Sequence, residues 1–208
     1  MSWSETLVLV VAILLLVAWL AWIVASRLDR LHRKVAGTSA VLDNQLVRRA
    51  SVAAELAWSG LLDPVSSVLV GEAAWQAIGA GGGEPGALLE IPEGLAGSLG
   101  DPTVATADVD RDMAESELSR TLRAALADPA DVAELQQDGV GAELLAALAS
   151  AWYRVQLARR FHNAAVSQAQ QVRRKILVRS LRIAGHAPMP QTVEIDDGWP
   201  EALPPSVR

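Results

Sequence analysis

The sequence contains no cysteine, and this absence removes several kinds of chemistry. Disulfide bonds, thiol nucleophiles and thiolate metal sites are all excluded, and the composition fits a reducing compartment. Lysine is nearly absent as well, since only Lys34 and Lys175 stand beside sixteen arginines. Together with abundant alanine, this usage is typical of a high-GC bacterial genome.

Familiar catalytic motifs are also missing. The chain has no H-E-x-x-H, no G-x-S-x-G and no G-x-x-x-x-G-K-[ST]. The glycine-rich run at 79–86 lacks the lysine and the preceding strand of a phosphate-binding loop, so we interpret it as a linker. His32, His162 and His186 are too scattered to predict a metal site. We therefore expect no catalytic residue, no cofactor and no metal; an enzyme whose site the sequence does not show is the least favoured alternative.

An apolar run at residues 6–25 contains no charge, glycine or proline. As a helix it would be about 30 Å long, the thickness of the hydrocarbon core of a bilayer. A cleaved signal peptide is the alternative, but the run is too long, lacks a preceding basic residue and has a poor cleavage site. We predict that residues 1–26 comprise an extracytoplasmic N-terminus and an uncleaved transmembrane anchor.

Basic residues follow the apolar run and none precedes it. The positive-inside rule therefore places the N-terminus outside and the large C-terminal domain in the cytoplasm. The predicted localisation is the cell membrane, crossed by a single helix.

The pattern after the anchor predicts an all-α fold, an antiparallel up-down bundle of about four helices, two of them long. Apolar and small residues recur about every 3.6 residues from Leu28 to Ala57 without a breaker, so the anchor helix should continue to that point. Asp63 is expected to cap the second helix and Pro64 to begin it. The later helices are predicted over about 64–78, 108–127, 131–137 and 141–184.

These elements define three regions. The cytoplasmic bundle is predicted at 27–185 and includes a flexible acidic and glycine-rich loop at 80–107. A proline-rich acidic tail, extended or disordered, follows at 186–208.

The positions of apolar and small residues predict which helix faces pack together. The first and last long helices should pair so that Leu46 lies beside Asn163, Arg48 near Asn163 or His162, and Ala57 near Trp152. The buried face of the second helix is predicted to comprise Val65, Val68, Leu69, Ala73 and Ile78.

Charge is strongly segregated along the chain. Residues 63–150 carry three basic and sixteen acidic residues, whereas residues 151–185 carry eight basic and none acidic. Such blocks are typical of solvated helix faces that attract one another. The acidic half argues against nucleic-acid binding.

Two stretches carry a recognisable pattern. Residues 40–49, AVLDNQLVRR, match five positions of A-W-x-Q-I-D-V-Q-L-K-R-R. Residues 158–166, ARRFHNAAV, match A-R-x-F-Y-N-x-A-V except for His162 in place of Tyr. The sequence thus resembles the LemA family of bacterial membrane-anchored helical proteins. The resemblance implies an N-terminal anchor and a cytoplasmic antiparallel bundle, and it implies no particular activity.

Two groups of polar residues are candidate sites. The first is predicted to be an interhelical polar network that fixes the register of the long helices, with a small-ligand site as the alternative. Its members are Asp43, Arg48, Arg49, Arg159, His162 and Asn163. The second is a basic cluster at the membrane surface, suited to anionic lipid headgroups, to an acidic partner protein or to simple solvation. Its members are Arg27, Arg30, Arg33, Lys34, Arg173, Arg174, Lys175, Arg179 and Arg182.

These features favour a scaffold or adaptor for membrane-associated partners. The expected partners are the lipid bilayer and either another membrane protein or further copies of this chain. A membrane-linked sensor that binds a small ligand is the alternative.

Overall fold

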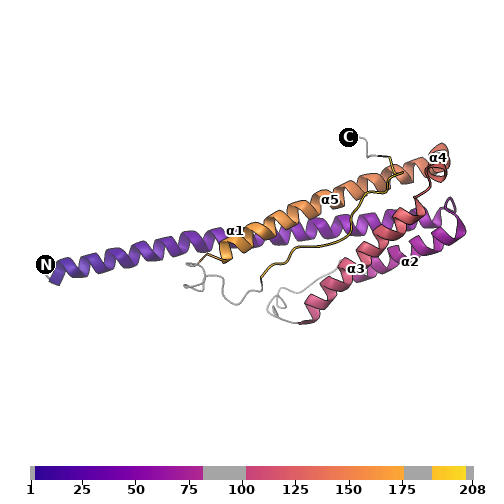
Figure 1. Ribbon diagram of the computed structural model, residues 1–208. Helices are drawn as coiled ribbons and strands as arrows, with labels where there is room; N and C mark the ends of the chain where they lie inside the picture. The colour runs from indigo at the N-terminus through magenta and orange to yellow at the C-terminus, as the bar shows by residue number, and fades with distance from the viewer. Residues whose placement is uncertain (1–2, 82–101, 176–188, 205–208) are drawn as a thin grey trace, which may run out of the picture.

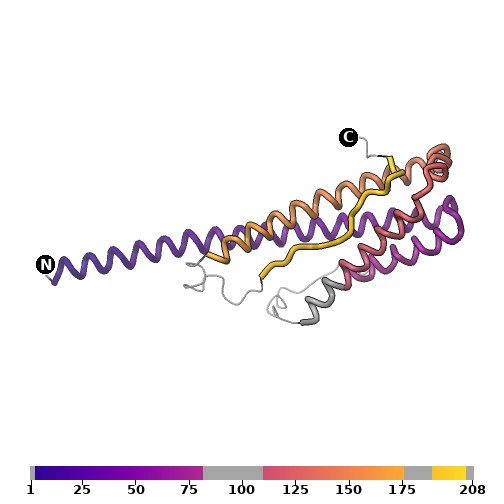
Figure 2. Tube along the Cα trace, viewed as in Figure 1, coloured from indigo at the N-terminus to yellow at the C-terminus, as the bar shows by residue number. Residues whose placement is uncertain are grey.

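Five helices form most of the described chain. The computed structural model describes residues 3–81, 102–175 and 189–204 (Figures 1 and 2). Over these ranges the structure has no β-strand, so the prediction of an all-α protein is confirmed. The helices are α1 (Trp3–Trp58), α2 (Pro64–Ala80), α3 (Pro102–Ala125), α4 (Pro129–Gln137) and α5 (Gly139–Arg173).

The first helix, α1, is a single element of 56 residues. The prediction that it continues unbroken through Ala57 is confirmed. It contains no proline, and its one glycine, Gly37, lowers helix stability by about 1 kcal/mol without breaking the hydrogen-bond ladder. The helix ends at Trp58, and Gly60 beyond it has a φ of 74°, a left-handed conformation that glycine favours.

The N-terminal part of α1 projects beyond the other helices (Figure 1). An 18-residue window there has a mean hydropathy of 3.1, and none of it is buried. By length and composition, this part of the helix is able to cross a membrane.

Helices α1 and α5 lie side by side and antiparallel (Figure 1). Leu28 packs with Val172 at the end nearer the apolar run. Farther along, the guanidinium carbon of Arg49 lies 5.0 Å from the centre of a Trp152 ring.

The predicted register of this pair was wrong by about two helical turns. Leu46 packs with Val155 and Ala158 rather than beside Asn163. The prediction carried the last helix to Ala184 and aligned its end with the start of the bundle. In the structure α5 ends at Arg173, so the pairing shifts along α1.

The start of α2 was predicted correctly. The carboxylate of Asp63 accepts hydrogen bonds from the backbone N–H groups of Val65 and Ser66, at 3.0 and 3.1 Å. Pro64 occupies the first helical position, where its missing N–H has no cost.

The predicted buried face of α2 was largely wrong. Val65, Val68 and Leu69 are exposed. The buried residues are Val70, Ala73, Ala74 and Ala77. Small side chains let two backbones approach closely, and this close approach selected the alanine face over the larger aliphatic side chains.

The main core lies at the end of the molecule far from the apolar run. It joins Leu56 of α1, Val70 of α2, Leu122 of α3 and Leu148 of α5, all fully buried. At the corner between α4 and α5, a Cβ added to Gly141 would lie 2.3 Å from the carbonyl oxygen of Leu135. Glycine is therefore required at that corner.

The predicted loop and tail are partly described. Residues 82–101 and 176–188 lie outside the described residues, whereas 102–107 belong to α3 rather than to the predicted loop. Residues 189–204, here called the C-terminal strap, form an extended segment along α5 (Figure 2). The tail was predicted to be either extended or disordered, and the strap is extended.

Candidate functional site

Arg49 is fully buried at the junction of α1, α3 and α5. Its guanidinium donates to Glu115 Oε2 at 2.7 Å, to the carbonyl oxygen of Glu115 at 3.1 Å and to Ser119 Oγ at 2.9 Å. The face of Trp152 covers the cation. Burial raises the pKa of Glu115, and the attraction of Arg49 opposes that rise. This closed ion pair fixes how three helices meet.

A second ion pair joins the same helices nearer the apolar run. Arg111 of α3 donates to Asp43 of α1 at 2.8 Å, with both side chains partly exposed. The ion-pair partners of Asp43 and Arg49 therefore lie on α3 rather than on the predicted partner, α5, although Arg49 also contacts the Trp152 ring of α5. Glu115 lies in the acidic segment 63–150, so the segregation of charge was the available signal for these ion pairs. That signal did not indicate which residues pair.

Among the described residues, His162 is the one member of the predicted network that lies within hydrogen-bonding distance of a side chain on the opposite long helix. Its Nδ1 lies 3.3 Å from the hydroxyl oxygen of Thr38. Burial lowers the pKa of His162, so the neutral ring is favoured. Arg48 is exposed and forms no ion pair among the described residues, so it does not belong to the network.

Asn163 binds the strap rather than α1, which corrects the prediction. Its Nδ2 donates to the carbonyl oxygen of Val193 at 3.0 Å, and its Oδ1 accepts from the N–H of Val193 at 3.0 Å. About two turns farther along α5, Gln170 donates to the carbonyl oxygen of Pro190 at 2.8 Å. Both amides therefore bind main-chain atoms of an extended segment.

Arg159 also binds the strap. Its Nε and one terminal nitrogen donate to the two carboxylate oxygens of Asp197, each at 2.9 Å, in a bidentate pair. The carbonyl oxygen of Asp197 accepts from Trp152 Nε1 at 3.0 Å and from Gln156 Nε2 at 2.7 Å. Asp197 is thus held through its side chain and its main chain by three residues of α5.

The opposite side of the strap is bound by α3. The N–H of Asp196 donates to Ser116 Oγ at 3.0 Å, and the N–H of Glu194 donates to Asp112 Oδ2 at 3.1 Å. Arg123 donates to both carboxylate oxygens of Asp196. This guanidinium lowers the pKa of Asp196 to about 2. The strap therefore occupies a groove between α3 and α5, which we call the strap groove.

Apolar side chains anchor the strap at two points. Ile195 is buried with Leu42 and Leu46 of α1 and Val155 of α5. Leu203 belongs to the main core.

An aromatic contact adds to this anchoring. The ring of Trp199 packs edge-on against Trp152, with centres 6.4 Å apart. Sequence reasoning missed the whole arrangement, although the paired Asp196 and Asp197 opposite the basic block of 151–185 were a usable signal.

The described members of the predicted basic cluster lie around one level of the molecule. Leu28 and Val172 pack together, which brings the last turn of α5 beside the part of α1 that follows the apolar run. Arg179 and Arg182 lie outside the described residues. The side chains of the following members are exposed: Arg27, Arg30, Arg33, Lys34, Arg174 and Lys175. Arg173 is half-buried. We call these seven residues the basic collar.

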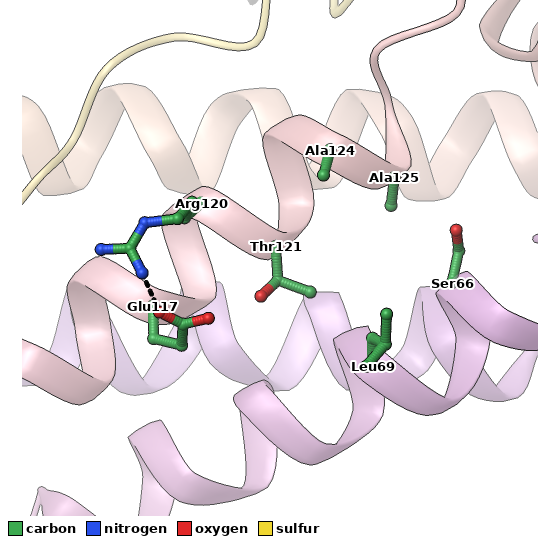
Figure 3. A pocket seen from close by; sticks show the side chains of 7 residues that line it. All are labelled: Ser66, Leu69, Glu117, Arg120, Thr121, Ala124 and Ala125. Atoms are coloured by element: carbon green, nitrogen blue, oxygen red, sulfur yellow. Dashed lines mark hydrogen bonds and ion pairs between the residues drawn. The ribbon is translucent and has the colours of Figure 1, made fainter.

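A shallow hollow of about 310 Å³ lies between α2 and α3 (Figure 3). Ser66 and Leu69 border it from α2, and Thr121 and the ion pair of Glu117 with Arg120 border it from α3. Across the described ranges, no group of three His, Asp or Glu side chains is placed to hold a metal ion.

Comparison of the chain with protein-family models, with curated proteins and with solved structures found no match. The resemblance to the LemA family therefore stays a prediction.

Proposed function

We propose that this chain is a single-pass membrane protein whose cytoplasmic helical domain acts as a scaffold or adaptor for membrane-associated partners. The observation that carries the proposal is the construction of α1. One helix contains both an uncovered apolar segment and the central element of the folded domain. A bilayer would bury that segment, since its exposed apolar side chains have no cover within the described chain.

The basic collar supports the same placement. It surrounds the level at which the apolar segment ends and the helical domain begins. Anionic lipids attract each such residue by about 1 kcal/mol. The absence of basic residues before the segment favours an N-terminus outside and a domain in the cytoplasm.

The scaffold role follows from what the domain presents. Its charged centre, Arg49 with Glu115, is closed to solvent and holds helices together. Large apolar side chains are exposed elsewhere, including Trp58, Trp75 and Phe161. Exposed aromatic residues are common at protein interfaces. Binding to another protein therefore fits this surface better than catalysis.

Topology can be tested directly because the chain has no cysteine. Single cysteines replace Ser2 and Ser206 in separate variants, and intact cells are then treated with an impermeant thiol reagent. The proposal requires labelling at Ser2 and none at Ser206 until the cells are lysed. Labelling only at Ser206 would reverse the orientation, and labelling at both would exclude a spanning helix.

Contact of the collar with lipid needs a second measurement. A donor dye at Gln171, an exposed position of α5, reports its distance from acceptor lipids in proteoliposomes. We expect stronger energy transfer in anionic than in neutral bilayers. Replacing Arg174 and Lys175 by Gln should remove the difference, whereas replacing the exposed Arg154 and Arg160 by Gln should keep it. Equal transfer in both bilayers would exclude lipid contact by the collar.

A further inference from the structure

We propose that the strap groove is a binding site for an extended acidic segment of a partner protein, with the C-terminal strap as its intramolecular occupant. This inference rests on the adaptor function proposed above and specifies the chemistry of the partner. Its basis is how α3 and α5 contact the strap.

The groove binds main chain more than side chains. Eight hydrogen bonds form between side chains of α3 and α5 and main-chain atoms of six described strap residues, which donate three of these bonds and accept five. Asn163 bonds to both the N–H and the carbonyl of Val193, as a neighbouring β-strand would. Recognition of an extended peptide commonly obtains affinity from main-chain bonds and specificity from a few pockets.

Three positions of the strap supply specificity. Asp196 pairs with Arg123, and Asp197 pairs with Arg159. Ile195 fills an apolar pocket. The groove thus selects an apolar residue followed by Asp-Asp.

Charge favours an acidic occupant. The segment 151–185, which includes residues 151–173 of α5, has eight basic and no acidic residues. The strap region, 186–208, has four acidic residues and one basic residue. An acidic segment of another protein would meet the same complementary field.

The strap is built so that it can be replaced. It follows all five helices in the chain, so it can leave without unthreading any of them. The side chains of Arg123 and Asp196 are 30% and 42% exposed, and ion pairs exposed to this degree contribute little. If the strap leaves, Asn163, Gln170 and the indole N–H of Trp152 lose their bonds, and an incoming extended segment would restore them.

A partner segment must compete with an occupant attached to the same chain, whose effective concentration is on the order of millimolar. Both proteins would need to be held at the membrane, or the strap would need to be weakened. This competition determines the design of the test.

The probe is a fluorescent peptide with the sequence of residues 189–204, added to the full chain in detergent. We expect weak binding to the unaltered chain. The double variant Asp196→Asn and Asp197→Asn should bind the probe at least tenfold more tightly, because its own strap has lost both of its ion pairs to the helices. The matched double variant Glu194→Gln and Glu201→Gln removes the same charge at exposed positions and should bind like the unaltered chain.

Two further variants test where the probe binds. Adding Arg159→Gln to the weakened chain should reduce probe binding at least tenfold. A probe with Asn in place of its second Asp should bind equally poorly. Binding that is no tighter in the weakened chain, or that is insensitive to Arg159→Gln, would overturn the proposal.

Hydrogen exchange of the unaltered chain keeps the test independent of whether variants fold. The amides of Val193 and Glu194 should exchange faster than helix-core amides such as that of Leu148, through opening of the strap alone. If these amides exchange only at the rate of global unfolding, the strap is a permanent part of the core and the proposal is refuted.

A different occupant is a possible outcome. A dimer of the unaltered chain that dissociates in the Asp196→Asn and Asp197→Asn variant would show that a second copy fills the groove, and the partner-segment proposal would be wrong. All of these measurements are made in detergent. Their failure therefore leaves the topology result at Ser2 and Ser206 unaffected.

Discussion

The buried pair of Arg49 and Glu115 allows a sharp test of what holds the three helices together. We consider Glu115→Leu, which removes the carboxylate and keeps a similar volume. The guanidinium of Arg49 is completely buried and would then lack a counter-charge. Removing one partner of a buried pair costs about 3–5 kcal/mol. For a chain of this size, that corresponds to a fall in Tm of roughly 6–20 °C.

The double variant Arg49→Met and Glu115→Leu should behave differently. Burial raises the pKa of Glu115 even with Arg49 beside it, so desolvation outweighs the attraction between the charges. Replacing both charges with apolar side chains should therefore leave the free energy of unfolding within about 1 kcal/mol of the unaltered chain. A methionine at this position also suits the Trp152 ring that Arg49 covers.

The assay is thermal and urea unfolding of the full chain in detergent, followed by circular dichroism. The single variant Arg49→Met leaves a buried carboxyl that can take up a proton. Its cost should therefore shrink as the pH falls. Glu117→Leu is the control, because its pair with Arg120 is exposed, and the change should be within about 1 kcal/mol. The reasoning fails if Glu115→Leu costs less than about 1 kcal/mol, or if the double variant costs as much as both single variants together.

Three other changes have definite expected results. Gly141→Ala should lower Tm, because the added Cβ would lie 2.3 Å from a backbone oxygen. Gly37→Ala, where the added Cβ has open space, should instead raise the free energy of unfolding by about 0.5–1 kcal/mol. Equal shifts of Tm in the two variants would contradict this. Ala165→Leu in the α1–α5 contact should cost about 1–3 kcal/mol and the exposed Ala164→Leu almost nothing, measured by urea unfolding. The carboxyl of Asp196 should titrate near pH 2 when followed by NMR. Its contribution to the stability of the bound strap is fully present above the ordinary pKa of 3.8 and is lost as the pH falls through about 2. A titration midpoint near 3.8 would exclude the ion pair with Arg123.

Local rules predicted the helices well. The absence of proline from Leu28 to Ala57 was enough to predict one continuous helix, because nothing there interrupts the hydrogen-bond ladder. Asp63 followed by proline was enough to predict where α2 begins. These features depend on neighbours in sequence, which the sequence shows directly.

The contacts between distant segments could not be predicted in the same way. On α2, both an aliphatic and an alanine face were available, and close approach to α1 selected the second. Asn163 and Arg159 were predicted to bind the opposite long helix, but their hydrogen-bond partners are in the strap. An extended segment has no helical periodicity to reveal which residues it contacts, so the strap groove was missed.

The unbroken course of α1 has a mechanical consequence. Between residues 25 and 58 the helix is about 50 Å long, with no hinge at which a change of angle could be absorbed. If the apolar part tilts in a bilayer by about 20°, the far end of the helix swings sideways by about 17 Å. The helices that pack against α1 must then move with it as a rigid body. Bilayer thickness would then set the height and lateral position of the strap groove relative to the membrane surface.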